Sequence, residues 1–474
     1  MPSTLCFREV SALQLPEQFA AYITQVCDQL RWKKAHPVIQ REMEAHLCDQ
    51  YDAFVKSGMS EDAAVEETLL MTGDAVEIGA GLDRVHRPKP SWGLLILTGI
   101  LLLTGLSIKL FFTYDSDYPH ELPAMLVAAV LGIGCLFGAY FMDFTLLGKR
   151  PVLLYLCTLG SILFLRTFHT GIPGHCEPYL SLLCPAVYAA LLYRLRGKRY
   201  LGFFLSVLCL AVLSFVFCFI PSFGAILTVA AAGTLLMAAA VWNDWFRLGK
   251  AHGCLMWGIL VVLCTAILCF CIFNNAYALE KVKLAFSPGL DSTGRGWAGS
   301  IIRELLAASN LIGPGNAVPY ASEKLHMVSR STSLLLTNLI YRTGWLTFIL
   351  IMAVFAAFLG IAAHKCLKQK NMLGRLVSLA VLLTFAMQII LYLLLNFGVY
   401  LVGDLCLPLV SYGNTALVLD MALIGIMLST FRTGSLVRDN ASVVHGRKVW
   451  PRIKEHVHWN DGELTISFKK KLAS

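Results

Sequence analysis

The sequence predicts an all-α fold, a polytopic membrane helix bundle with about ten transmembrane helices, preceded by a small helical cytoplasmic domain. Of the 474 residues, 57% are hydrophobic and only 15% are charged, and the mean hydropathy is +0.66. The surface of a soluble globular domain does not tolerate so apolar a composition. Long uninterrupted apolar runs, separated by short charged loops, are the second observation.

The apolar runs define the expected transmembrane helices. A helix needs about 20 apolar residues to cross a hydrocarbon core that is about 30 Å thick. The ten runs that approach or exceed this length cover residues 92–112, 122–142, 151–168, 178–193, 200–219, 222–242, 253–274, 333–363, 373–400 and 409–431.

The loops between these runs predict the orientation of the bundle, because short cytoplasmic loops collect Lys and Arg. Lys149 and Arg150 follow the second run, and Arg247 and Lys250 follow the sixth. The loops after the fourth and eighth runs, "RLRGKR" and "HKCLKQKNMLGR", are also basic. We therefore expect a membrane protein with both termini in the cytoplasm and a large extracellular loop at residues 275–332.

Charge separates the chain into domains. Residues 1–90 contain 9 Lys and Arg against 14 Asp and Glu, a net charge of −5, whereas the remainder carries +14. Within this acidic part, "HPVIQREMEAHLCDQYDAFVKSG" predicts an amphipathic helix that stops at Gly58, and Ser60 is the expected N-cap of the next helix. We expect a cytoplasmic helical domain at 1–90, a transmembrane domain at 91–432 and a basic cytoplasmic tail at 433–474, in which "GELTISFKKK" alternates like a short strand.

The pattern of the first domain, from "REMEAHL" to "RVHRPKPSW", resembles the small helical prefix domain that precedes permease-type membrane parts in some Gram-positive bacteria. That resemblance implies a regulatory or docking module.

The last apolar run carries a motif in "LPLVSYGNTALVLD". It resembles the last helix of the SEDS family, the FtsW, RodA and SpoVE proteins of cell division, cell shape and sporulation. The family signature is Leu-Pro, two apolar residues and Ser-Tyr-Gly-Gly; Leu407, Pro408, Ser411, Tyr412 and Gly413 match it, and Asn414 replaces the second Gly. Upstream, "FSPGLDSTGRGW" and "LLAASNLIGPG" resemble the family's glycine-rich elements, and "RTFHTGIPGHCEP" is similar to a segment whose acid is Glu177 here.

The resemblance implies a multi-pass protein of the bacterial plasma membrane with a role in peptidoglycan synthesis. SEDS proteins polymerise lipid II, the undecaprenyl-diphosphate-linked disaccharide-pentapeptide, outside the membrane, usually beside a class B penicillin-binding protein. A base must accept a proton from the acceptor sugar hydroxyl, and cations, or a divalent metal such as Mg²⁺ or Mn²⁺, must stabilise the diphosphate leaving group. The partners expected here are accordingly lipid II, a penicillin-binding protein and the membrane, and not nucleic acid.

The catalytic position departs from the family pattern. The family's Asp follows a Thr at the start of the eighth helix, where this chain has Ser333 after Thr332. A serine hydroxyl cannot serve as a base without a partner, so Asp291 and Glu304 are the alternative catalytic carboxylates. The expected substrate-binding residues are Arg295, Arg303, Lys324, Arg330, Glu177, Pro408, Ser411, Tyr412 and Gly413.

Two charged residues stand inside apolar runs. Arg342 follows Ser333 by nine residues and Asp420 follows Ser411 by nine, so uninterrupted helices would place both about 13 Å below the outer surface. Equal depth and opposite sign predict a buried ion pair, because charges within a bundle are costly unless they find partners. The alternative is separate solvation of each in a water-filled cavity.

Two functions follow from these observations. The first is a divergent peptidoglycan glycosyltransferase that uses another outer carboxylate. The second is a non-catalytic protein that binds or flips lipid II or acts as a scaffold for a partner enzyme, and Ser333 favours it.

Overall fold

The computed structural model describes residues 16–86, 90–114, 121–168, 177–220, 222–291, 296–319, 332–399, 406–411, 413–434, 457–460 and 463–466. The chain divides into two compact units, Met1–Pro90 and Ser91–Ser474. Each unit is described by itself.

The first unit is a small helical bundle. It contains α1 (Glu17–Asp28), the 3₁₀ turn η1 (Lys33–Ala35), α2 (His36–Lys56), α3 (Glu61–Thr72) and α4 (Ala75–His86). Its core is formed by the buried side chains Phe19, Ile23, Leu30, Ile39, Leu47 and Val65. As predicted, α2 ends just before Gly58, which has φ = +97°, and Ser60 is the N-cap of α3, although its side chain makes no capping hydrogen bond.

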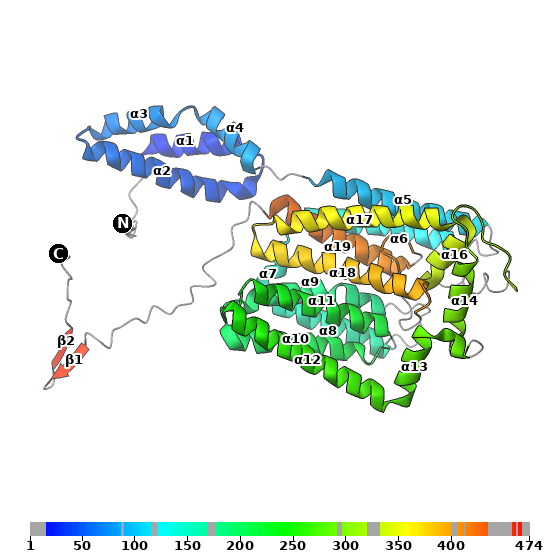
Figure 1. Ribbon diagram of the computed structural model, residues 1–474. Coiled ribbons are helices and arrows are strands. Elements are labelled where there is room, and N and C mark those ends of the chain that lie inside the picture. The colour runs from blue at the N-terminus through cyan, green and yellow to red at the C-terminus, as the bar shows by residue number, and fades with distance from the viewer. Residues whose placement is uncertain are drawn as a thin grey trace. The chain divides into compact units, whose positions relative to one another are not determined.

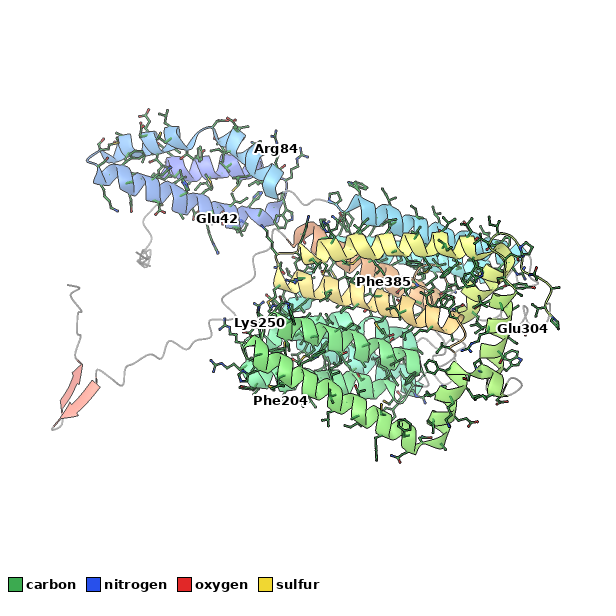
Figure 2. The ribbon with its side chains drawn as sticks, viewed as in Figure 1. Glu42, Arg84, Phe204, Lys250, Glu304 and Phe385 are labelled. Atoms are coloured by element: carbon green, nitrogen blue, oxygen red, sulfur yellow. The ribbon has the colours of Figure 1, made fainter. Side chains whose placement is uncertain are left out.

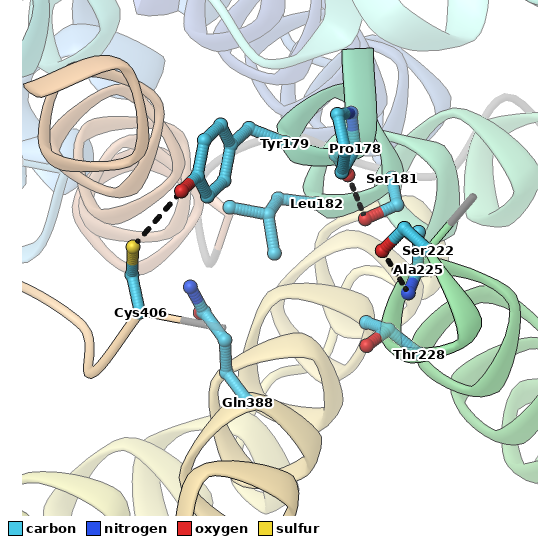
Figure 3. Close-up of a pocket in the computed structure, with 9 residues that line it drawn as sticks. All are labelled: Pro178, Tyr179, Ser181, Leu182, Ser222, Ala225, Thr228, Gln388 and Cys406. Carbon is cyan, nitrogen blue, oxygen red and sulfur yellow. Dashed lines mark hydrogen bonds between the residues drawn. The ribbon is translucent and has the colours of Figure 1, made fainter. Parts of the chain in front are cut away.

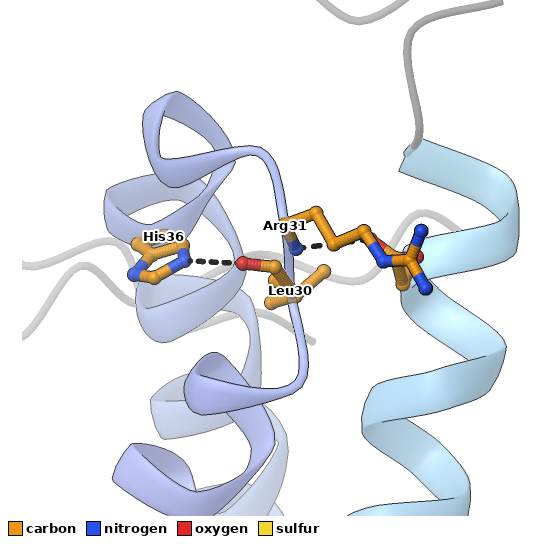
Figure 4. A network of polar contacts seen from close by, with 4 residues as sticks. Leu30, Arg31 and His36 are labelled. Carbon is orange, nitrogen blue, oxygen red and sulfur yellow. Dashed lines mark hydrogen bonds and ion pairs between the residues drawn. The ribbon is translucent and has the colours of Figure 1, made fainter.

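Polar contacts fix the link between α1 and α2 (Figure 4). The backbone N–H of Arg31 donates to Asp83 Oδ1 on α4 at 3.0 Å, and His36 Nε2 donates to the Leu30 carbonyl at 3.1 Å. The link is therefore held by α4 and by the first residue of α2. The sequence did not predict α1 or α4.

The second unit begins with α5 (Trp92–Tyr114), α6 (Glu121–Phe141), α7 (Thr145–Lys149), α8 (Pro151–Phe168), η2 (Glu177–Leu182), α9 (Cys184–Leu195), α10 (Arg199–Phe217), α11 (Phe223–Trp242) and α12 (Lys250–Asn274). It continues with α13 (Ala276–Phe286), η3 (Pro288–Asp291), α14 (Trp297–Ala307), η4 (Thr332–Leu334), α16 (Leu335–Thr343), α17 (Trp345–Leu367), α18 (Met372–Asn396) and α19 (Asn414–Thr433). Near the C-terminus, β1 (Val457–Asn460) and β2 (Glu463–Ile466) pair antiparallel, with Val457 opposite Ile466, and β2 confirms the strand expected in the tail.

The described helices confirm the predicted fold class. Nine of them are long and apolar enough to cross a membrane, and the shorter apolar helix Pro151–Thr167 corresponds to the third predicted run. The long helices lie side by side in a bundle, whereas α13, α14 and α16 lie at one end of it, here named the α14 end (Figure 1). The protein is thus a multi-pass membrane protein.

Helix α18 lies at the centre of the bundle. One apolar core joins it to α5, α6, α17 and α19, and a second joins its first turns, at Leu376 and Ala380, to α8, α9, α10 and α11. The side chains of α18 are buried along most of its length. A polar residue on this helix therefore meets protein and not lipid.

Helices α6 and α19 pack at very close range. A side chain at Gly425 would overlap the carbonyl oxygen of Leu136 and the methyl group of Ala139, and one at Gly132 would press on Met421. Small residues are common where membrane helices approach closely, because they let the backbones meet.

The eighth apolar run is two helices and not one. Helix α16 ends at Thr343 and α17 begins at Trp345, with Gly344 between them at φ = +96°, a conformation that favours glycine. A side chain at Gly344 would also overlap the backbone of Leu311 and Ile312. The glycine therefore allows both the turn and the contact with the preceding loop.

The glycine-rich segment 308–316 pairs with the backbone groups that this break exposes. Gly313 N–H donates to the Thr343 carbonyl at 3.1 Å, and Gly315 N–H donates to the Tyr341 carbonyl at 2.7 Å. In the opposite sense, the first N–H groups of α17 donate to the carbonyls of Asn310 and Leu311 at 3.1 and 3.0 Å. Both helix ends thus obtain partners for backbone groups that no helix can satisfy internally.

The α6–α19 contact leads to a prediction about Gly425. We expect Gly425→Ala to lower the stability of the purified protein by about 1–3 kcal/mol, because the added methyl group has no room. Gly134→Ala on α6 is the matched control, since that position is open, and there alanine should be neutral or stabilising by up to about 1 kcal/mol. Thermal unfolding in detergent measures both changes, and equal midpoints for the two variants would contradict the close packing.

Candidate functional site

The candidate site is built where three short helices meet at the α14 end. Ile301, Ile302 and Leu305 of α14 pack against Leu334, Tyr341 and Leu395. The 3₁₀ turn η3 is joined to the start of α14 by the Gly296 N–H, which donates to the Asp291 carbonyl at 3.0 Å. These contacts bring the elements that carry Asp291, Glu304 and Ser333 together in one part of the bundle.

Asn396, at the end of α18, holds the beginning of α16. Its Oδ1 accepts hydrogen bonds from the N–H and the hydroxyl of Thr337, both at 3.0 Å, and its Nδ2 donates to the Ser333 carbonyl at 2.9 Å. Leu334, the N-cap of α16, supplies no side-chain cap, so Asn396 takes that role from 59 residues away. Asn396 has no exposed surface.

Ser333 is therefore a buried residue in a fixed backbone. Its relative exposure is 5% and its carbonyl is bound by Asn396. A hydroxyl needs a neighbouring base before it can act as a nucleophile or accept a proton. Neither its burial nor the hydrogen bond at its carbonyl gives Ser333 the chemistry of an acid at this position.

The alternative carboxylates lie in more accessible surroundings. Asp291 ends η3 and Glu304 is on α14, and both side chains are half-buried. Figure 2 shows Glu304 at the α14 end of the bundle and Lys250 near the opposite end. Access to solvent and substrate is possible at both acids, as a general base requires.

Arg303 makes a structural contact. Its Nη2 donates to the carbonyls of Ala285 and Phe286 at 3.4 and 3.0 Å. These are the last residues of α13, so the guanidinium caps the carbonyl end of that helix. Its predicted substrate contact stays a prediction.

Several predicted site residues lie outside the described parts. Arg295, Lys324, Arg330 and Tyr412 belong to undescribed segments, and for Glu177 the structure gives only the backbone, in η2.

The motif turn, residues 406–411, packs deep against α5. A side chain at Gly105 of α5 would overlap the backbone of Leu409 and Val410, and Leu409 itself has φ = +62°, an uncommon value for a residue with a side chain. Pro408 and Ser411 are buried, and Gly413, the N-cap of α19, leaves no space for a side chain beside Cys406. The motif thus shapes a tight turn before the last helix.

A small cavity lies between this turn, η2, α11 and α18 (Figure 3). It is lined by Pro178, Tyr179, Ser181, Leu182, Ser222, Ala225, Thr228, Gln388 and Cys406. The Tyr179 hydroxyl lies 3.2 Å from Cys406 Sγ. The cavity has a volume of about 20 Å³, which suits about one water molecule and is too small for a sugar.

The predicted ion pair between Arg342 and Asp420 is wrong. The break at Gly344 leaves Arg342 in the last turn of α16, so the argument from equal depth fails. Arg342 Nε donates to Asn338 Oδ1 at 3.1 Å, and its guanidinium lies 5.5 Å from the ring centroid of Phe112. Asp420 is 1% exposed, and neither of its carboxylate oxygens has a hydrogen-bond partner in the parts of the chain that the structure describes.

The site residues predicted from the sequence do not include three polar residues that the structure shows to be buried. Asn396 and Gln388 lie on one face of α18, and Lys109, only 4% exposed, lies on α5. Each interrupts an apolar run, which is a signal that the sequence contains. Only the structure shows which neighbours each residue meets.

The described residues do not assemble a metal site by themselves. Among them, no group of three or more His, Cys, Asp or Glu side chains could hold a metal ion. Mg²⁺ is often held by one or two carboxylates together with substrate phosphates. Asp291 or Glu304 fits such a shared site only in the presence of a diphosphate.

The fold and this site define a polytopic membrane protein whose large connecting segment folds over one end of the helix bundle. The chain belongs to the FtsW/RodA/SpoVE family: the family model, described as "Cell cycle protein", matches residues 180–434. The match includes α14, the glycine-rich segment, the helix break and the motif turn.

Relatives in bacteria carry informative names. A "Probable peptidoglycan glycosyltransferase FtsW" of Trichlorobacter lovleyi is 24% identical over 210 residues, which are 44% of this chain and 52% of that protein. The protein of the same name from Thiomicrospira cyclica is 26% identical over 174 residues, 36% of this chain and 44% of that one. The chain thus spans about half the length of the curated relatives it matches.

Solved structures support the fold. A chain from the structure titled "Structural coordination of polymerization and crosslinking by a peptidoglycan synthase complex" aligns with a TM-score of 0.58 and 19% identity, over 73% of this chain and 99% of that one. A variant of the rod shape determining protein RodA from Thermus thermophilus aligns with a TM-score of 0.51 and 16% identity, over 74% and 99%.

The Asn396 contacts lead to a prediction. Asn396→Ala would remove the hydrogen-bond partner of the buried Thr337 N–H and of the buried Ser333 carbonyl. We therefore expect the free energy of unfolding to fall by at least about 2 kcal/mol. Asn274→Ala is the matched control, because Asn274 Nδ2 bonds only the Phe270 carbonyl on an exposed helix end, and its effect should stay within about 0.5 kcal/mol. Denaturation in detergent compares them; an Asn396→Ala protein as stable as the control would refute the capping role.

Proposed function

We propose that the chain acts on lipid II outside the bacterial plasma membrane, as a divergent peptidoglycan glycosyltransferase. The observation that carries this proposal is the family match over residues 180–434, which contains η3, α14, η4, α16 and the motif turn. Two relatives named as probable peptidoglycan glycosyltransferases support the reaction class.

The orientation that suits this function places the α14 end outside. Basic residues collect at the ends of helices remote from α14, with Lys149 after α6, Lys250 at the start of α12 and Lys365 at the end of α17. Short cytoplasmic loops attract such residues. Both termini would then be cytoplasmic, and Asp291 and Glu304 would face the compartment in which lipid II is polymerised.

The chemistry assigns different parts to acids and cations. Asp291 or Glu304 would accept the proton of the acceptor hydroxyl, because both carboxyl groups are accessible. Outer cations, with Arg295, Lys324 and Arg330 as candidates, would stabilise the diphosphate. Mg²⁺ or Mn²⁺, when held between the diphosphate and one of these acids, would neutralise charge on the leaving group.

A second function is favoured by Ser333. The buried serine, whose carbonyl is held by Asn396, occupies the position at which the family pattern has its acid. A chain that binds or flips lipid II, or scaffolds a penicillin-binding protein, needs no base there. The match to a peptidoglycan synthase complex supports a partner of this kind.

Polymerisation of labelled lipid II by the purified full chain, with Mg²⁺ or Mn²⁺, tests the proposal. If Asp291 or Glu304 is the base, Asp291→Asn or Glu304→Gln should lower the rate about 10²- to 10⁴-fold, because general base catalysis contributes about that factor. Glu280→Gln, an exposed acid on α13, is the matched control and should leave the rate unchanged.

Ser333→Asp separates the two functions. Glycan strands made by the native chain would exclude the non-catalytic function. Strands made only by the Ser333→Asp variant would exclude the alternative-carboxylate mechanism. Retention of labelled lipid II without polymer from either protein would favour binding or scaffolding, and the absence of both binding and polymer would contradict the proposal as a whole.

A further inference from the structure

Asp420 is the most unusual polar residue of the membrane domain. It is 1% exposed and is enclosed by the packed helices α6, α18 and η2. Its carboxyl group lies beside the Gln388 carboxamide and the backbone N–H of Leu409. Within the described structure neither carboxylate oxygen forms a hydrogen bond, and Gln388 Oε1, which is also buried, has no partner either.

The two neighbouring residues thus hold three buried oxygen acceptors without a hydrogen-bond partner in the described structure, in a region of low dielectric constant. An isolated carboxylate is expensive in such a place, and an acceptor without a donor adds to the cost. One added proton removes both difficulties, because it neutralises the carboxyl group and turns one acceptor into a donor for Gln388 Oε1. The cavity that Gln388 lines offers space for about one water molecule through which that proton can enter.

Among the described residues, no charged side chain forms a hydrogen bond with the Asp420 carboxyl group. The titratable side chains described on the neighbouring elements are Arg375 and Tyr392 of α18, Tyr179 of η2, Cys135 and Tyr140 of α6, Cys406 of the motif turn and, behind that turn, Lys109 of α5. Arg375 is 13 residues from Gln388, about 20 Å along the helix. Lys109 lies one turn beyond Gly105 on the face of α5 that meets the motif turn, and it forms no hydrogen bond to Asp420 among the described residues.

We propose that Asp420 and Gln388 form a proton-binding site inside the membrane domain, in which the Asp420 carboxyl group holds the proton and donates it in a hydrogen bond to Gln388 Oε1. The site couples α19 to α18 through that hydrogen bond. The proposed site does not depend on the peptidoglycan chemistry at the α14 end, so measurements that need no substrate can test it.

Infrared spectroscopy of the full chain in nanodiscs tests the site directly. At pH 7 the native protein should show the carbonyl stretch of a neutral carboxylic acid, and D420N should lose it. Glu280→Gln, which changes an exposed acid on α13, is the control and should keep the band. Equal absorption of the native protein and D420N in the carbonyl region of neutral carboxylic acids would mean that Asp420 is ionised, and this would overturn the proposal.

Stability against pH is the second measurement. The folded chain would hold a proton that the unfolded chain releases, so the unfolding equilibrium constant of the native protein should rise with pH between about pH 5 and 7, by up to about tenfold per unit. D420N should fold, because asparagine is neutral, has nearly the same shape and can donate an N–H to Gln388 Oε1, and it should lose this dependence. Two results would overturn the proposed proton in favour of a bound cation. One is that D420N fails to fold. The other is that sodium, compared with choline, stabilises the native protein but not D420N.

Discussion

The unpaired backbone at the break between α16 and α17 is the constraint on which the α14 end depends. A helix break in a membrane protein needs partners for the N–H and carbonyl groups that it exposes. The glycine-rich segment supplies donors at Gly313 and Gly315 and acceptors at Asn310 and Leu311, and therefore must lie against the break. Its position brings α14 onto α16, and with it the acids at Asp291 and Glu304.

The number and approximate bounds of the membrane helices could be predicted because hydropathy depends on composition alone. The break at Gly344 could not, since the run 333–363 remains apolar through it and a glycine inside a helix is tolerated at a cost of about 1 kcal/mol. That single unseen turn invalidated the comparison of depths between Arg342 and Asp420. The same limitation applies to α7, a one-turn helix with no apolar run of its own.

The candidate site could be predicted in part. Ser333, Asp291 and Glu304 were found from their places in motifs, which are local in the sequence. Asn396 bonds groups 59 and 63 residues away, and no local pattern predicts such a contact. Arg303 shows the converse problem, because an exposed cation on a loop suggests substrate binding, whereas here its donors cap a helix.

Helix α18 connects the two polar regions of the bundle. Gln388, Tyr392 and Asn396 follow one another at intervals of four residues, so they form a buried stripe on one face, about 12 Å long. The Asn396 side chain forms hydrogen bonds with the start of α16, whereas Gln388 faces Asp420 and the cavity. A small rotation of α18 would disturb both ends of the stripe at once. The stripe thus gives a physical reason why the packing of α19 against α18 and the position of Ser333 depend on the same helix.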